Sequence, residues 1–213
     1  MIVAVDWVAV SSIVTAAATL VLAVATFASV RSANRSARIA ERSLLAGLRP
    51  LLAVSRSDDP DQKVGFSDNR WYRLGGGEAV AEVEDGNLYL AISIRNVGSG
   101  IAVLHGWHFH AEPPTGRGEH PPVEDFHRLT RDIYVAPGEL GFFQGVLRDA
   151  ADADLADARS AFEERRRVAI DVLYGDHELG QRSVTRFGIV PRDEGGWIAS
   201  VARHWNVDRP DPR

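Results

Sequence analysis

The sequence has no cysteine, and only one of its 213 residues is a lysine. Without cysteine the chain has no disulfide, no thiol nucleophile, no iron–sulfur cluster and no thiolate zinc site. The single lysine, Lys63, lies in the segment DQKVG, which has neither the glycine spacing of a phosphate-binding loop nor a helix start. A P-loop nucleotide site is therefore excluded. The length suits one ordinary domain with an appendage.

The chain also lacks charge over a long N-terminal stretch. Residues 7–30 contain 24 consecutive uncharged positions. A helix of that length reaches about 36 Å, against about 30 Å for the hydrocarbon core of a bilayer. A buried core helix rarely extends so far without a polar face, and a signal peptide would begin with positive charge, whereas only Asp6 is charged before this run. We therefore predict an uncleaved transmembrane anchor within residues 1–30.

Basic residues are distributed unequally around this stretch. None precedes it, and five arginines follow within 20 residues. Because cytoplasmic flanks of membrane helices carry the excess of Lys and Arg, the pattern predicts a single-pass protein of the cell membrane with a cytoplasmic C-terminal domain. The five are Arg31, Arg35, Arg38, Arg42 and Arg49.

These arginines recur at steps of 4, 3, 4 and 7 residues, which puts them on one face of an amphipathic juxtamembrane helix, the stalk, over residues 31–50. Gly47 and Pro50 indicate where this helix stops. Two interpretations stay open. Either the guanidinium groups meet anionic lipid headgroups, at about 1 kcal/mol each, or they form a solvated face that only sets the topology. The candidate membrane-surface residues are Arg31, Arg35, Arg38 and Arg42.

Small residues recur every four positions within the predicted span, which allows two helices to pack closely in a membrane. The series is Ser11, Thr15, Thr19 and Ala23. The alanine-rich face of the stalk adds about two heptads. Together they predict a homo-oligomer held through the span and the stalk.

After Pro50 the pattern changes to short β-rich runs separated by Gly, Pro, Asn and Asp. Nine such runs and one helical stretch over 149–166 predict a mainly β domain over residues 51–207, followed by a flexible tail over 208–213. Antiparallel strands in that number favour a β-sandwich, with Trp107 in its core and residues 197–205 as the last edge strand. The predicted strands span residues 51–57, 79–84, 87–95, 101–111, 131–135, 141–147, 167–174, 181–190 and 197–205.

Three segments carry a resemblance to a known group of proteins: RSANRSARIAERSLLAGLRP after the single span, SIRNVGSGIA, and the hairpin text YGDHELGQRSVTRF. With these segments the chain resembles uncharacterised single-pass bacterial membrane proteins that carry a soluble immunoglobulin-like β-sandwich. The resemblance covers nearly the whole chain and implies that fold and membrane location. It implies no catalytic residues.

Histidines are densest in the segment HGWHFH. Strand alternation puts His108 and His110 on one face, and His105 lies just before them. Two imidazoles can share a metal ion, and a third ligand would come from His105 or from the following segment, where the candidates are Glu112, His120 and His127. The alternative is that these are ordinary surface histidines on a half-exposed strand and bind no metal.

Two motif-like stretches lack residues that their chemistry requires. His177 and Glu178 begin an HExxH pattern, but Gln181 stands in place of the second histidine, and flanking glycines predict a hairpin turn. Gly98 and Gly100 follow a strand as in a dinucleotide-binding loop, but another strand pattern follows instead of a helix. The segment therefore predicts a tight turn between paired strands, with glycine at positive φ.

Charge clusters in the β-rich part predict solvated faces. The acidic clusters lack the glycine and terminal glutamate of an EF-hand loop. The basic run 165–167 follows two glutamates, in a region over 51–213 that holds 19 basic and 27 acidic residues, so nucleic-acid binding is disfavoured. The acidic clusters are Asp58, Asp59 and Asp61, and Asp149, Asp152, Asp154 and Asp157.

The leading hypothesis from the sequence is a membrane-anchored, non-enzymatic binding or scaffold module with an unknown protein partner. Its alternative is a metal-binding sensor or enzyme that uses His105, His108 and His110. No cofactor is expected under the leading hypothesis, and the lipid bilayer is the one partner that the sequence itself indicates.

Overall fold

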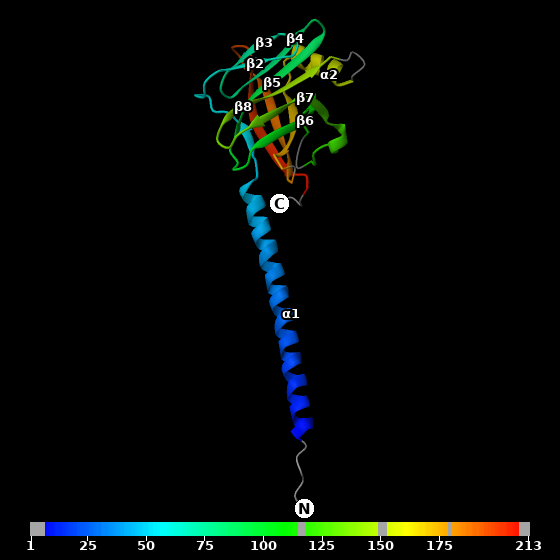
Figure 1. The fold of residues 1–213 in the computed structure, drawn as a ribbon. Coiled ribbons are helices and arrows are strands. Elements are labelled where there is room, and N and C mark those ends of the chain that lie inside the picture. Colours follow the sequence, from blue (N-terminus) through cyan, green and yellow to red (C-terminus); the bar gives the residue numbers. More distant parts are fainter. Residues whose placement is uncertain (1–6, 115–117, 149–152, 179, 209–213) are drawn as a thin grey trace, which may run out of the picture. The chain divides into compact units, whose positions relative to one another are not determined.

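The computed structural model describes residues 7–114, 118–148, 153–178 and 180–208 (Figure 1). The chain divides into two compact units, residues 1–46 and 47–213. The first unit holds the long helix α1, and we call the second unit the β domain.

Helix α1 is continuous over 41 residues, Trp7–Gly47, and ends at the predicted glycine stop. At about 1.5 Å per residue it extends about 60 Å. It is the one helix among the described residues that is long and apolar enough to cross a membrane, and none of its apolar window is buried. Large apolar side chains such as Trp7, Leu20 and Phe27 are exposed around it. The span and the stalk that the sequence separated therefore form one helix.

Five hydroxyl groups within the apolar stretch of α1, from Ser11 to Thr26, donate hydrogen bonds to backbone carbonyls of the same helix. Thr15 donates a hydrogen bond to the carbonyl of Ser11 at 2.8 Å, and Thr19 donates to Thr15 at the same distance. Thr26 donates to Leu22 at 2.7 Å. Because each hydroxyl has an acceptor one turn earlier, these residues fit a helix that lipid surrounds.

The β domain is built on one antiparallel sheet of nine strands, in the order β1-β5-β4-β11-β10-β9-β6-β7, with β8 on β5. A separate hairpin forms from β2 and β3. The strands are β1 (Leu52–Val54), β2 (Gln62–Gly65), β3 (Trp71–Leu74), β4 (Glu78–Glu84), β5 (Asn87–Asn96), β6 (Ala102–His110), β7 (His127–Val135), β8 (Leu140–Leu147), β9 (Val168–Asp176), β10 (Arg182–Pro191) and β11 (Trp197–Asn206).

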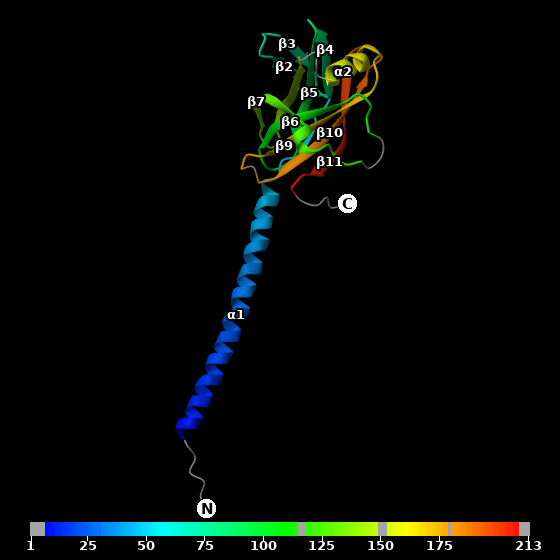
Figure 2. The ribbon, with the colours of Figure 1, turned by 90° about the vertical axis from the view of Figure 1, so that its right-hand side faces the viewer.

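The large sheet curls around the main core, so that its two ends, β7 and β8, approach each other (Figures 1 and 2). Alternate residues of the strands fill the inside, among them Ile92, Trp107, Phe143 and Phe187. The mainly β, antiparallel character that the sequence predicts is confirmed. The immunoglobulin-like sandwich is not confirmed, because hydrogen bonds link all nine strands into one curled sheet instead of two separate sheets.

Helix α2 (Ala153–Glu163) covers one end of the curled sheet (Figures 1 and 2). Its buried residues recur at helical spacing: Leu155, Ala158 and Phe162. The ring of Phe162 contacts Trp197 edge-on, with centroids 5.0 Å apart. The prediction of one helix in this stretch is confirmed, although residues 149–152 of the predicted range lie outside the described residues.

The nine predicted strands are present, and the structure adds the hairpin β2–β3, which the sequence reasoning missed. The hairpin packs on the outer face of β5, where Val64, Phe66 and Leu74 meet Tyr89 and Ala91. Its strands are only four residues long and mix polar with apolar residues. This composition has no alternation strong enough to predict a strand.

Two β-bulges reverse the side-chain alternation of their strands. In β6, Leu104 pairs with Tyr174 and Gly106 with Leu173, so His105 is the extra residue. In β11, Val201 and Arg203 oppose consecutive residues of β10, so the strand has an extra residue between them. Trp197 therefore points into the main core, whereas Trp205, eight residues later, belongs to an apolar cluster on the outer face.

Two predictions about chain connections are wrong. The turn after Asn96 does not join paired strands, because β5 and β6 have different partners in the sheet. Gly98 and Gly100 in this turn do not have positive φ angles. Instead they let two backbone segments lie close together, because a Cβ on Gly100 would lie 1.6 Å from the Leu48 carbonyl oxygen. The strand over 197–205 is not a simple edge, because β11 pairs with β10 along its length and with β4 at Trp197 and Ile198.

Of the predicted flexible tail, residues 209–213 lie outside the described residues. Asp208 is described and is held by Arg182, whose guanidinium donates to it at 2.7 Å. The segment between β6 and β7 contains a short 3-10 helix, η1 (Val123–Asp125).

Candidate functional site

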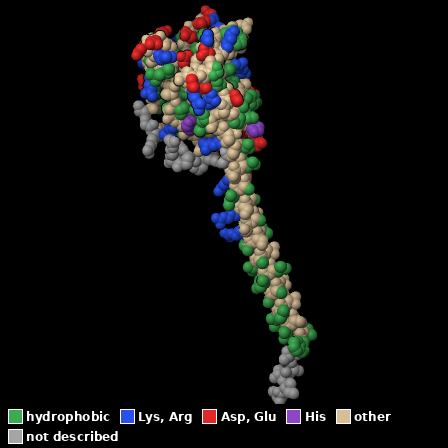
Figure 3. Space-filling model, turned by 90° about the vertical axis from the view of Figure 1, so that its left-hand side faces the viewer, with side chains coloured by type: hydrophobic (Ala, Val, Ile, Leu, Met, Phe, Trp, Pro, Cys, Tyr) green, Lys and Arg blue, Asp and Glu red, His purple; other side chains and the backbone are tan. Residues whose placement is uncertain are grey.

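The predicted arginine stripe lies on α1. Arg31, Arg35, Arg38 and Arg42 are all exposed, and Figure 3 shows basic side chains on one side of the helix. Arg49 was predicted in the same stripe, and this is wrong. The helix ends at Gly47, and Arg49 belongs to the β domain, where its guanidinium donates to the side-chain oxygen of Asn206. We use the term arginine stripe for the remaining four residues.

The three clustered histidines do not form one site. His108 and His110 share the outer face of β6, as predicted, and their rings stack with centroids 4.7 Å apart. His105 is the bulged residue and faces a different group of side chains, near Gly175 and Arg182. The bulge, and not strand alternation, therefore decides where the first histidine lies.

His110 belongs to a buried ion-pair network. Its Nε2 donates a hydrogen bond to Asp171 at 2.9 Å. The guanidinium of Arg186 also donates to Asp171 through two bonds of 2.6 Å. Asp171 is fully buried, and Arg186 is nearly so. Burial by itself would raise the pKa of Asp171, but the hydrogen bonds from Arg186 and His110 outweigh it, so the pKa is lowered.

The network is covered by aromatic and apolar residues on the outer face. The guanidinium of Arg186 lies 4.8 Å from the ring centroid of Trp205, and that of Arg203 lies 5.0 Å from it. Trp205 itself packs with Phe126 and Leu173. Because Asp171 is engaged by two partners and shielded from water, this arrangement has the character of a structural brace and leaves no carboxylate open for acid–base chemistry.

His105 faces a cavity of about 800 Å³ on the outer side of the sheet. The imidazole Nε2 is buried and has no hydrogen-bond partner within the described residues. Burial lowers the pKa of His105, and nearby Arg182 acts in the same direction, whereas Asp132 opposes it. The walls combine apolar and charged groups: Val123, Phe126, Leu173, Glu124, Arg128 and Arg182.

The other histidines that the sequence offered as ligands lie apart from this cluster. The Nε2 of His127 donates a hydrogen bond to Asp154 at 2.9 Å, and its ring lies beside that of Trp107, with centroids 5.1 Å apart. The Nδ1 of His120 donates to the carbonyl of Pro121 at 2.6 Å. Across the described ranges, no three His, Asp or Glu side chains come close enough together to hold a metal ion. The metal hypothesis therefore gains no support from the geometry.

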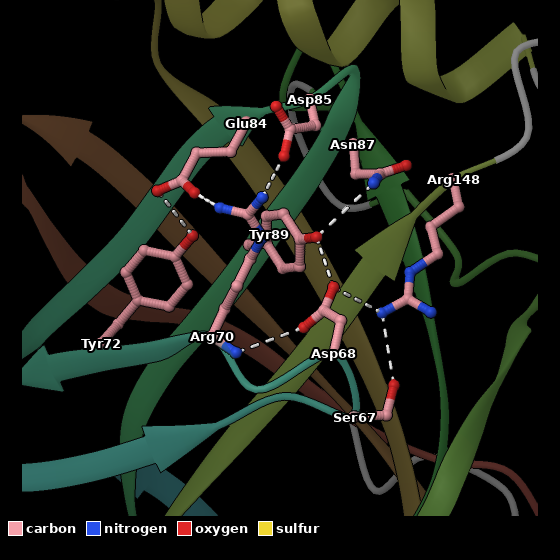
Figure 4. A network of polar contacts seen from close by, with 9 residues as sticks. All are labelled: Ser67, Asp68, Arg70, Tyr72, Glu84, Asp85, Asn87, Tyr89 and Arg148. Atoms are coloured by element: carbon pink, nitrogen blue, oxygen red, sulfur yellow. Dashed lines mark hydrogen bonds and ion pairs between the residues drawn. The ribbon is translucent and has the colours of Figure 1, made fainter.

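A second polar network ties the β2–β3 hairpin to the large sheet (Figure 4). The hydroxyl of Tyr89 donates to Asp68 and holds the pKa of that carboxyl below its usual range. Arg148, just after β8, donates to the same carboxylate at 3.1 Å. Arg70 makes ion pairs with Glu84 and Asp85 at the β4–β5 turn. The hairpin is thus held in place by contacts with three strands.

The predicted acidic clusters are mostly paired structural residues. Asp59 lies 2.5 Å from Arg95, and its pKa is lowered by the Arg56 backbone N–H and then by Arg95. Asp61 pairs with Arg73. Asp154 contacts His127, while Asp149 and Asp152 lie outside the described residues. These contacts supply no calcium-binding loop.

The remaining motif-like stretches are also structural. Asp176, at the end of β9, accepts hydrogen bonds from the backbone N–H groups of Glu178 and Gly180, which gives the predicted hairpin turn. Within the basic run, Arg165 lies over the ring of Trp197 at 5.3 Å, and Arg166 pairs with Glu164 at 2.9 Å.

Comparison with known proteins adds no homologue to this description. No protein-family model matches the sequence, and no curated protein matches it.

Proposed function

We propose that this protein is a single-pass membrane protein whose β domain is a non-enzymatic binding module held at the bilayer surface. The observation that carries the proposal is α1: its apolar stretch is entirely unburied, and the arginine stripe follows directly after it. An exposed apolar surface of this size in water is strongly unfavourable, whereas a bilayer matches both its length and its composition.

The distribution of charge supports the orientation. The excess of arginine lies on the C-terminal side of the apolar stretch, which favours a cytoplasmic β domain. Because α1 is continuous, Arg31 and Arg35 then lie nearest the lipid headgroups, and Arg38 and Arg42 follow farther along the helix on the cytoplasmic side. At about 1 kcal/mol each near an anionic surface, the first two add about 2 kcal/mol to the attachment.

The carboxylates of the two polar networks support binding over catalysis. Asp171 and Arg186 neutralise each other in the interior, and Asp68 is held by Tyr89 and Arg148. A catalytic acid or base needs a proton-accepting atom directed at a substrate, and these carboxylates are directed at fixed protein partners. An immunoglobulin-like relationship of the β domain is part of this proposal.

The test is a topology measurement on the full chain in membranes. We expect the protein to stay in the pellet after carbonate extraction. Protease added outside intact cells should leave the β domain whole, and the same protease should digest it in inverted vesicles. Release by carbonate, or digestion from outside, would overturn the proposal. A variant with Leu20 and Leu22 replaced by Arg is the control, because it should no longer insert.

A further inference from the structure

The two ends of the curled sheet do not close into a barrel. Strands β7 and β8 follow each other through the short turn 136–139, but the structure has no ladder between them. Strand β8 pairs with β5 along one edge, and no described strand pairs with its other edge. An unpaired edge presents a row of backbone N–H and C=O groups that can accept an added strand.

Strand β7 also departs from its own partner beside this edge. Leu104 pairs with Ile133, and the next paired residues are Gly106 and Arg128, so residues 129–132 stand outside the β6–β7 ladder. Arg131, in this excursion, reaches across the opening and donates to the side chain of Gln144 on β8 at 2.8 Å. The two strands are therefore splayed, with one side-chain bridge between them.

A groove occupies the opening. It consists of two adjoining cavities, of about 210 and 450 Å³, which share the residues Phe66, Ser67, Thr130 and Gln144. The hairpin β2–β3 forms one wall, β7 forms the other, and outward-facing residues of β8 form the floor. Gly145 in this floor leaves no room for a side chain, because an added Cβ would lie 2.7 Å from the Trp107 ring.

The groove is basic although the region that contains it is acidic. Residues 51–213 hold 27 acidic and 19 basic side chains. The groove is nevertheless lined by four basic residues and by no Asp or Glu: Arg128 and Arg148 line one cavity, and Lys63 and Arg131 line the other. Arg148 pairs with Asp68, but the other three have no carboxylate partner within the part of the chain that the structure describes. Three uncompensated cations along one groove attract an acidic ligand.

The hairpin wall ends in an exposed aromatic side chain. Trp71 is 57% exposed, and the ammonium of Lys63 lies 4.9 Å from its ring centroid. The network around Asp68 and Tyr89 holds this hairpin on the sheet (Figure 4). An indole on a fixed support offers an apolar surface to a ligand at little loss of conformational entropy.

We propose that this groove binds an extended acidic peptide segment of a partner protein, which adds as a strand along the free edge of β8. The inference rests on the proposed binding function and names its site and the chemistry of its partner. The backbone of the peptide pairs with β8, its carboxylates meet Lys63, Arg128 and Arg131, and an apolar side chain packs on Trp71. A free strand edge favours a peptide over a lipid headgroup, which makes no such backbone pairing.

The experiment uses the full chain in nanodiscs of neutral phosphatidylcholine. The probe is the peptide Thr-Glu-Val-Glu-Val-Glu-Thr-amide with fluorescein on its N-terminal amine, and its control has glutamine in place of each glutamate. We expect the glutamate peptide to bind and the control to bind at least about tenfold more weakly. The variants Lys63→Glu and Arg131→Glu should each weaken binding by about tenfold. Arg56→Glu, an exposed position outside the groove, should leave it unchanged.

Two further measurements use the unmodified chain. Carbodiimide should join the peptide to Lys63, which is the only lysine and so gives one diagnostic crosslinked fragment. Hydrogen exchange should slow in residues 140–147 when the peptide is bound, since strand addition protects those amides. Equal affinity for both peptides, no binding at millimolar concentration, or binding without this protection would overturn the inference.

The outcome separates this inference from the proposed function. Protein that stays in the nanodisc but does not bind the peptide retains the membrane anchor and loses only the groove proposal. Protein that does not enter the nanodisc contradicts the anchor itself. If phosphatidylserine vesicles displace the peptide and Lys63→Glu abolishes vesicle binding, the groove is a lipid headgroup site and the peptide proposal is wrong.

Discussion

Among single residues, Asp171 is the one whose loss has the clearest consequence. It is fully buried and receives hydrogen bonds from Arg186 and His110. In Asp171→Asn the Arg186 charge stays buried without its counter-ion, so we expect the free energy of unfolding to fall by about 3–5 kcal/mol. Urea unfolding of the detergent-solubilised chain, followed by tryptophan fluorescence, measures it.

The matched control removes both charges. In the double variant Asp171→Leu with Arg186→Met no charge is left unpaired, and we expect stability close to that of the unchanged protein. A double variant as unstable as Asp171→Asn would show that shape, and not charge, decides at this position.

Asp171 also makes the free energy of unfolding depend on pH in the acidic range. The folded-state pKa of Asp171 is below its ordinary value of 3.8. Its contribution to stability is therefore fully present above about pH 4 and is lost as the pH falls below that value through the folded-state pKa. The difference in unfolding free energy between the unchanged protein and Asp171→Asn should shrink over that range. A constant difference down to pH 2 would contradict the assignment.

Among the elements, α2 contributes to the β domain through its apolar face. Phe162 contacts Phe109 and Trp197, with ring centroids 5.9 and 5.0 Å away. Truncation in Phe162→Ala leaves a cavity at the end of the curled sheet, and we expect a loss of about 3–5 kcal/mol in the free energy of unfolding. Asp157→Ala, on the exposed face of α2, is the control and should change stability by less than about 0.5 kcal/mol. Chemical denaturation of both variants checks this.

The two bulges show why strand elements could be predicted while their faces could not. Alternation correctly put His108 and His110 on one face of β6. It cannot place residues on the two sides of a bulge, because one extra residue exchanges the inner and outer positions. His105, the bulged residue, therefore lies where alternation does not predict it, and alternation alone would put Trp197 and Trp205, eight residues apart, on one face.

For the whole molecule in its membrane, the arginine stripe can have either of two roles: it contacts anionic lipid, or it only sets the orientation of the helix. Four Arg→Gln changes on the full chain should lower the extent to which anionic lipid enriches around the protein. With about 1 kcal/mol for each arginine near the headgroups, the preference for phosphatidylserine over phosphatidylcholine should fall by about fivefold at each lipid contact. Arg→Lys changes at the same positions keep the charge and should keep the preference.

Spin-labelled lipid analogues and the full chain in mixed bilayers provide the measurement. An unchanged lipid preference in the glutamine variant would support the alternative, in which these arginines only orient the helix. Because Lys and Arg are equivalent for a diffuse surface potential, a loss in the lysine variant would instead indicate bidentate phosphate contacts.

The elements whose signal is local could be predicted from the amino-acid sequence. Twenty-four uncharged positions, the 4, 3, 4 spacing of arginines and the strand alternation follow from neighbouring residues, and they predicted the long apolar helix, the stripe and nine of the strands. Tertiary structure alone decided the rest. Whether Arg49 joins the stripe, which face Trp205 takes, and whether β7 meets β8 depend on the helix end, a bulge and the curl of the sheet. These arise from contacts between segments distant in sequence, which no local pattern records.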